Sequence, residues 1–187
     1  MSAPGPETLD RALLVVIDMQ PGFLKAIPGG DAVTRRCAFA ISAAALVGIP
    51  VAFTEQVPAK LGPTDPALFA LAPGAAVFGK DTFSACNDTA FAAALEARGT
   101  THLLLAGIET PVCVFQTALG ALGRGLHVTI LSDAVGARRA DDATDVLRYL
   151  AMKGCHILPS ESVFYSVLGG AMHPRFREYT ALVKQFN

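Results

Sequence analysis

The hydrophobic residues form short continuous runs that alternate with longer segments of mixed polarity. Continuous apolar runs of this length are typical of strands buried on both faces of a sheet. The run Ala12-Leu-Leu-Val-Val-Ile17 is the clearest example. The same pattern predicts strands at residues 12–17, 50–54, 75–78, 101–106, 126–131 and 155–158.

Helical segments lie between the predicted strands. Asp31 suits the N-cap of a helix that runs to about Val47, and the Gly48 and Pro50 that follow end it. Strands joined by helical crossovers imply an α/β fold, with a parallel sheet covered by helices on both faces. A loop is predicted over the proline-rich residues 58–66. Further helices are predicted from Asn87 or Asp88 to Gly99, over 111–123 and 141–153, and in short terminal segments, the last from Pro174.

Composition narrows the class of protein. The chain has 187 residues, of which 52% are hydrophobic and 17% charged, against about 25% charged in an average domain. Fifteen Lys and Arg against sixteen Asp and Glu give a net charge of −1, which excludes a polybasic nucleic-acid binder. The length fits one domain over residues 1–187. The apolar excess favours a homo-oligomer in which another subunit covers part of the surface.

No targeting or membrane segment is expected. The N-terminal stretch Met1–Glu7 lacks the basic region and apolar core of a secretory signal. The uncharged run 37–54 is long enough for a membrane span, but Gly48 and Pro50 divide it into a helix, a turn and a strand. The scattered cysteines favour reduced thiols in a cytoplasmic protein over a zinc ribbon or a disulfide scaffold. They are Cys37, Cys86, Cys113 and Cys155.

Three reactive groups follow the ends of predicted strands. Asp18 follows the first strand, Lys80 follows the third, and the segment after the fourth leads to Cys113. Ligands of parallel sheets bind beyond the carboxyl ends of the strands, so these side chains are expected at one edge. Each has an ordinary alternative, as a turn-forming Asp, a solvated Lys or a small buried Cys. Their agreement in position favours a functional site.

The surroundings of Cys113 indicate a nucleophile. Thr110 suits a helix N-cap and Pro111 the first helical position. Cys113 is then expected in the first turn, where free N–H groups favour a thiolate and can hold an oxyanion. Glu109 acts in the opposite direction, because a nearby negative charge raises the pKa of a thiol.

Four segments resemble the isochorismatase-like hydrolases, also called the cysteine hydrolase superfamily. They are Val15-Val-Ile-Asp-Met-Gln-Pro-Gly-Phe23, Lys80-Asp-Thr-Phe-Ser84, residues 107–118 (GIETPVCVFQTA) and residues 128–134 (VTILSDA). Residues 54–64 are similar to the small isochorismatase-domain-containing proteins. The resemblance implies a three-layer α/β sandwich, with a six-stranded parallel sheet of order 3-2-1-4-5-6 flanked by helices.

The resemblance also assigns roles. It implies that Asp18 is the general base, Lys80 the charge-stabilising partner and Cys113 the nucleophile. It further implies a cis peptide between Ile108 and Glu109, and an oxyanion hole formed by the backbone N–H groups of Glu109 and Cys113. It places Phe23 against the substrate and Gln20 near Asp18. Two further candidates for substrate binding are Gln56, on the loop after the second strand, and Phe83, which follows Lys80 in the motif. Each of the two aromatic residues has an ordinary alternative as a core residue.

Departures from the family pattern narrow the chemistry. Nicotinamidases of this family resemble one another in an Asp-x-His…His zinc site after the second strand, whereas residues 53–65 contain no histidine here. No metal and no other cofactor are therefore expected. Some isochorismatases act without the cysteine, so the presence of Cys113 favours acyl transfer. The four histidines are expected to be ordinary surface or sheet-edge residues: His102, His127, His156 and His173.

The sequence thus predicts a cysteine-dependent hydrolase that acts on a small amide or related acyl substrate through a thioester. Isochorismatase-type vinyl-ether hydrolysis, imide hydrolysis and a catalytically silent oligomeric scaffold remain as alternatives. A Rossmann-type nucleotide binder is disfavoured, because the glycines of residues 120–125 lie at a helix end and not after the first strand. The expected partners are a small-molecule substrate and further copies of the chain, without nucleic acid or membrane.

Overall fold

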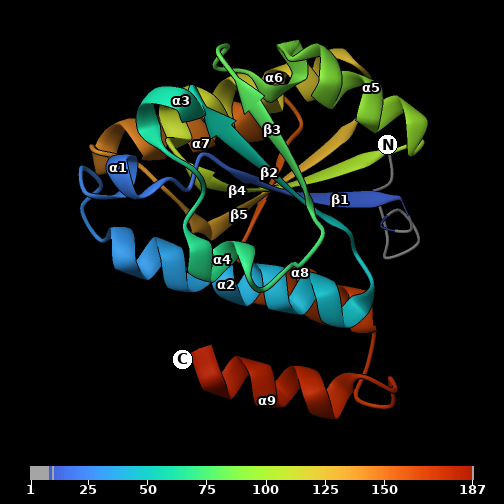
Figure 1. Cartoon of the computed structure of the whole chain (residues 1–187). Coiled ribbons are helices and arrows are strands. Elements are labelled where there is room, and N and C mark those ends of the chain that lie inside the picture. The colour runs from blue at the N-terminus through green and yellow to red at the C-terminus, as the bar shows by residue number, and fades with distance from the viewer. Residues whose placement is uncertain (1–8, 10, 187) are drawn as a thin grey trace.

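A parallel sheet of order β3-β2-β1-β4-β5-β6 forms the centre of the protein. The computed structural model describes residue 9 and residues 11–186. The stretch Met1–Glu7, for which no secretory signal was predicted, lies outside the described residues. The observed strand order confirms the predicted topology (Figure 1). The strands are β1 (Ala12–Ile17), β2 (Val51–Gln56), β3 (Ala76–Lys80), β4 (His102–Ile108), β5 (His127–Gly136) and β6 (His156–Leu158).

Long helices cover both faces of the sheet. One face carries α2 (Gly30–Val47) and α8 (Ser160–Leu168), and α9 (Phe176–Phe186) packs on the side of α2 that faces away from the sheet (Figure 1). The other face carries α5 (Thr89–Ala97), α6 (Phe115–Gly123) and α7 (Ala140–Met152). Within the described part of the chain, no helix has the length and apolarity needed to cross a bilayer.

Short helices occupy segments expected to be irregular. Residues 58–66 were predicted as a loop, but they contain α3 (Pro58–Leu61) and the start of α4 (Pro66–Phe69). The prolines start these helices, because their fixed φ suits the first helical position. Asp65 also caps α4 by accepting a hydrogen bond from the Ala67 N–H at 2.8 Å. The other short elements are α1 (Pro21–Leu24) and the 3₁₀ turn η2 (Ala85–Asn87).

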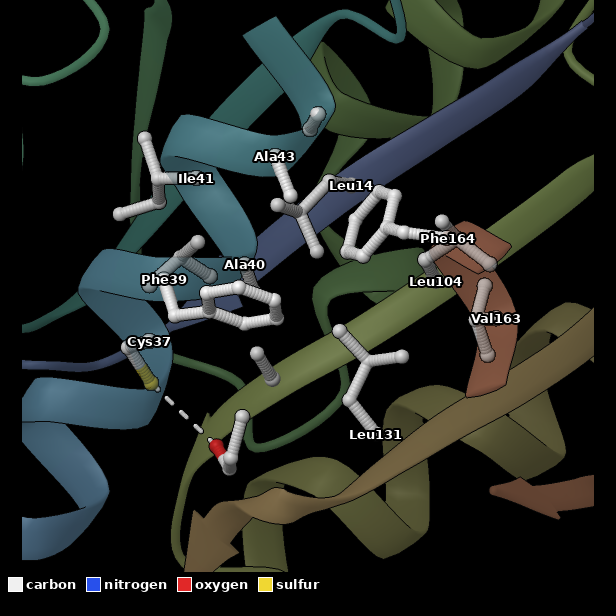
Figure 2. Packing of buried hydrophobic residues seen from close by; sticks show 14 of the residues in the cluster. Leu14, Cys37, Phe39, Ala40, Ile41, Ala43, Leu104, Leu131, Val163 and Phe164 are labelled. Atoms are coloured by element: carbon white, nitrogen blue, oxygen red, sulfur yellow. Dashed lines mark hydrogen bonds between the residues drawn. The ribbon is translucent and has the colours of Figure 1, made fainter. Parts of the chain in front are cut away.

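Alternate residues of β1 point into two separate cores, as expected for a strand buried on both faces. Leu14 packs beneath α2 and α8, in the cluster that contains Phe39 and Phe164 (Figure 2). The Cys37 thiol in the same region donates to the Ala134 carbonyl at 3.3 Å (Figure 2). Val15 packs on the opposite face, in the cluster under α5, α6 and α7. The two cores fix the central strands, whose carboxyl ends carry the candidate site.

Strand β5 extends beyond its predicted end at Leu131. Its pairing with β4 shifts register between Leu105 and Gly107, so the strand continues to Gly136. Such bulges absorb extra residues and redirect the strand. Within the irregular part, the Asp133 carboxylate accepts a hydrogen bond from the Ser160 N–H at 2.7 Å. The bulge explains why Ser132 and Asp133, polar residues that follow the predicted end of the strand, lie inside β5.

Three histidines stand side by side on β4, β5 and β6. The ring of His102 lies 5.8 Å from that of His127 and 6.4 Å from that of His156. The expectation of surface or sheet-edge positions is wrong for His102, which is 3% exposed because it lies on an inner strand. Burial, with the two neighbouring histidines, lowers the pKa of His102 to about 4. No group of three His, Cys, Asp or Glu side chains in the described residues is arranged to hold a metal ion.

Candidate active site

Asp18, Lys80 and Cys113 meet at the carboxyl edge of the sheet. Asp18 directly follows β1, Lys80 is the last residue of β3, and Cys113 lies in the turn after β4. The Lys80 Nζ is 2.7 Å from Asp18 Oδ2 and 3.8 Å from Cys113 Sγ. The side chains of Asp18 and Lys80 are each 1% exposed. A buried carboxylate and ammonium are therefore paired beside a thiol.

The Asp18 carboxylate is held from two sides. Its Oδ1 accepts a hydrogen bond from Thr54 Oγ1 at 2.7 Å, and its Oδ2 accepts one from Lys80. Asp18 has a φ of 51°, in the left-handed region that non-glycine residues seldom adopt and that recurs at functional sites. Both carboxylate oxygens thus have donors, which is what burial of a charge requires.

The Lys80 ammonium has further acceptors. It donates to Gln56 Oε1 at 2.6 Å and to the Thr82 carbonyl at 3.3 Å. Gln56 is itself fixed, because its Nε2 donates to the Asp81 carbonyl at 3.1 Å. The ammonium is therefore oriented between the carboxylate and the thiol by groups from β2 and from the segment after β3.

Cys113 lies in a π-helical turn, η3 (Thr110–Val114), which precedes α6. The prediction of Thr110 as the N-cap is wrong. Glu109 occupies that position, and the Thr110 hydroxyl donates to the Gly136 carbonyl at 3.1 Å because the bulged β5 brings that carbonyl near. The peptide bond between Ile108 and Glu109 is cis. Widened turns of this kind are frequent at functional sites.

Gly107 permits the close approach of β4 to β1 beside Asp18. Its φ is 108°, and a Cβ built there would lie 2.1 Å from the Ile17 carbonyl oxygen. That oxygen belongs to the backbone of β1, so it cannot rotate away. Only glycine fits this position, which aligns the strand leading to Cys113 with the strand leading to Asp18.

The surroundings of Cys113 favour the thiol form over the expected thiolate. Burial, and then the nearby Asp18 carboxylate, raise its pKa to about 12, although Lys80 acts in the opposite direction. Cys113 is 7% exposed, and burial disfavours the charged form of a thiol. A sulfur nucleophile at this position would need a neighbouring group to take the thiol proton, and the Asp18 carboxylate lies next to the thiol.

A cavity of about 240 Å³ opens onto these groups. Of the residues expected near a substrate, Phe23, Gln56 and Phe83 line it. Gln20 does not line it, because its amide is buried and donates to the carbonyls of Gln56 and Gly62. The full lining is Asp18, Phe23, Gln56, Phe83, Ile108, Glu109, Val112, Cys113 and Arg138.

Arg138 is a lining residue that sequence reasoning missed. It follows the end of β5 and pairs with Glu109, with Nε 2.9 Å from Oε1. The rule that selected Asp18 and Lys80 would also have selected it, had β5 been extended to Gly136. Ile108 and Val112 were missed as well, since an apolar residue in the cis peptide and one directly before Cys113 give no polar signal.

The fold and this site together define a three-layer α/β protein with a buried Asp–Lys pair beside a cysteine at a strand-to-helix turn. The family model for the isochorismatase domain matches residues 12–162. The chain belongs to the isochorismatase family of hydrolases.

Among characterised sequences, it is similar to isochorismatase domain-containing protein 2 of Bos taurus. The two are 35% identical over 175 residues, which cover 93% of this chain and 83% of the bovine protein.

Solved structures share the fold. The chain is 31% identical to a Caenorhabditis elegans protein described as MAR1 ribonuclease, with a TM-score of 0.89 over 98% of this chain and 93% of that one. The Escherichia coli YcaC protein is 20% identical and has a TM-score of 0.84, with 99% and 98% of the two chains covered. It is described as an octameric hydrolase of unknown specificity.

Proposed function

We propose that the protein hydrolyses a small amide or related acyl compound through a thioester on Cys113. The observation that carries this proposal is the buried Asp18–Lys80 pair beside the Cys113 thiol. The Lys80 ammonium lies 2.7 Å from the Asp18 carboxylate and 3.8 Å from the Cys113 sulfur. Membership of a hydrolase family supports the reaction type. We propose that the bond broken is a C–N bond of a small, non-peptide compound, and the modest cavity of about 240 Å³ supports the small size of the substrate.

The reaction proceeds in two halves. Cys113 Sγ forms a bond to the acyl carbon while its proton moves to Asp18, and the carbonyl oxygen becomes an oxyanion. The tetrahedral intermediate collapses, the C–N bond breaks, and the amine or ammonia leaves with the proton from Asp18. Water then adds to the thioester and gives a proton to Asp18. The acid leaves as the C–S bond breaks, and the thiol regains its proton.

Lys80 and two backbone N–H groups stabilise the charges that develop. The ammonium of Lys80 offsets the negative charge shared by Asp18 and the sulfur. We propose the N–H groups of Glu109 and Cys113 as the oxyanion hole, and one such donor is typically worth about 3 kcal/mol of barrier. In support, the Glu109 N–H has no hydrogen-bond acceptor among the described residues.

A panel of small amides, ureides, imides and isochorismate tests the reaction class. We expect turnover of an amide or ureide by the wild type, and a loss of about 10³-fold or more in Cys113→Ala. The matched control is Cys155→Ala, because Cys155 precedes β6 at the opposite edge of the sheet. Full turnover by Cys113→Ala contradicts the thioester.

The same panel separates the alternatives. Hydrolysis of isochorismate or of an imide that survives Cys113→Ala favours the vinyl-ether or imide chemistry. No turnover of any compound, with no covalent adduct on Cys113, favours a catalytically silent scaffold. An RNA oligonucleotide belongs in the panel, because a relative is described as a ribonuclease. Cleavage of the RNA that requires Cys113 contradicts acyl specificity.

We also propose that the protein acts as a homo-oligomer. The related YcaC protein is described as octameric. Light scattering at micromolar concentration tests the proposal, and a monomeric mass contradicts it. The surface offers large exposed apolar side chains for such contacts: Phe69, Leu71, Val77, Phe83, Tyr149, Met152, Leu158, Tyr165 and Met172.

A further inference from the structure

The charged groups that line the cavity are all paired. Asp18 pairs with Lys80 at 2.7 Å, and Glu109 pairs with Arg138 at 2.9 Å. The remaining lining is the Gln56 amide, the Cys113 thiol and apolar side chains. With Lys80 counted as the partner of Asp18, the cavity therefore contains charges of both signs but has no excess of either.

The Glu109 carboxylate is bound by Arg138 through both of its oxygens. Oε1 accepts from the Arg138 side-chain Nε at 2.9 Å, and Oε2 accepts from the Arg138 backbone N–H at 3.2 Å. The Glu109 side chain is 17% exposed and that of Arg138 is 63% exposed. The carboxylate is thus held close to the cavity, whereas the guanidinium extends towards solvent.

We propose that Glu109 cancels the charge of Arg138 and thereby removes the attraction that would otherwise favour substrates with a carboxylate or another anion near the acyl carbon. An arginine at the wall of a small cavity is otherwise a strong carboxylate-binding group. An anion that approaches Arg138 here also approaches Glu109, so repulsion offsets attraction. The proposal deepens the proposed function and rests on it, since it concerns the compounds that reach Cys113.

A second hollow beside the cavity repeats this arrangement. It has a volume of about 380 Å³ and shares Glu109, Val112 and Arg138 with the cavity. It also contains Arg139, which pairs with Asp142 at 2.6 Å. Each arginine that lines the two hollows is thus paired with a carboxylate, Arg138 with Glu109 and Arg139 with Asp142. A repulsive group placed next to an attractive one is a general device for specificity.

Two alkylating reagents that differ in charge test the proposal. Iodoacetamide is neutral, and iodoacetate carries a carboxylate bonded directly to the reacting CH₂ carbon. In both, Cys113 Sγ bonds to the CH₂ carbon, the C–I bond breaks, iodide leaves and the thiol proton goes to Asp18. Peptide mass spectrometry gives the rate at which each reagent modifies Cys113. The measured quantity is the ratio of the iodoacetate rate to the iodoacetamide rate. This ratio is divided by the same ratio for glutathione, which corrects for the intrinsic reactivity of the two reagents.

The variants are expected to move this ratio in opposite directions. Glu109→Gln keeps the shape of the side chain and removes its charge, so the ratio rises about ten-fold. Arg138→Gln leaves Glu109 uncompensated, so the ratio falls. The double variant returns it to near the wild-type value. Glu178→Gln is the control, because it breaks another exposed glutamate–arginine ion pair, with Arg175 just before α9, and leaves the ratio unchanged.

The outcomes separate the two proposals. A ratio that stays constant in both single variants, or moves in the same direction in both, overturns the role of Glu109 while Cys113 remains the nucleophile. A general loosening of the cavity produces such a common shift. If neither reagent modifies Cys113 in any variant while glutathione reacts, the nucleophile of the proposed function is wrong, and the selection proposal is overturned with it.

Discussion

Replacing Gly107 by alanine tests whether the contact between β1 and β4 beside the site depends on the absence of a side chain. The new Cβ would lie 2.1 Å from the Ile17 oxygen and 2.6 Å from its nitrogen. A φ of 108° costs a non-glycine residue about 1–3 kcal/mol. Relief of the overlap by backbone movement costs about 1–3 kcal/mol more. We therefore expect a loss of about 2–6 kcal/mol in the free energy of unfolding.

Urea unfolding of Gly107→Ala and of Gly123→Ala provides the comparison. Gly123 is the last residue of α6, and a Cβ there would meet nothing within 4 Å. Alanine at that position is expected to be neutral, or stabilising by up to about 1 kcal/mol. A loss of less than about 1 kcal/mol in Gly107→Ala would refute the argument, since it would mean that β1 and β4 separate without cost.

Three further predictions concern buried charges and the pH dependence of stability. Lys80→Met leaves Asp18 buried without its cation, so we expect a loss of about 3–5 kcal/mol in urea unfolding, whereas a loss below 1 kcal/mol argues that water reaches the carboxylate. His102 is neutral in the native state, where its pKa is about 4 against 6.5 in the unfolded chain. The unfolded chain therefore takes up a proton at this residue below pH 6.5 while the folded protein does not. The free energy of unfolding falls by about 3 kcal/mol as the pH drops from 6.5 to 4. His102→Gln should flatten that part of the stability profile. Asp133→Ala removes the acceptor of the Ser160 N–H at the start of α8. The free energy of unfolding should fall by about 1–2 kcal/mol, which thermal unfolding measures as a lower melting temperature.

The strands and the groups at their ends were predictable because local patterns encode them. The run 12–17 is apolar throughout, and β1 has those bounds. Asp18 and Lys80 were found because parallel strands end at one edge, a rule that needs no knowledge of distances. The strand order came from the family resemblance, since hydrophobic pattern does not distinguish one order from another.

Features that depend on long-range register were not predictable from the sequence. The bulge in β5 places Arg138 at the cavity, although a local pattern ends that strand at Leu131. Gln20 sits next to the site in sequence but is used to hold the loop at Gly62. The high pKa of Cys113 follows from burial beside Asp18, and burial of a helix start is set by what packs on it.

The strand order places a seam through the middle of the molecule. The sheet consists of β3-β2-β1 from the first half of the chain and β4-β5-β6 from the second, joined where β1 meets β4. Asp18 and Lys80 come from one side of the seam, and Cys113 and Arg138 from the other. During synthesis the first half is made without Cys113, and Cys113 lacks its proposed proton acceptor until the halves dock. If the chain were divided between β3 and β4, one fragment would hold Asp18 and Lys80 and the other Cys113. Alkylation of Cys113 would then report their reassembly.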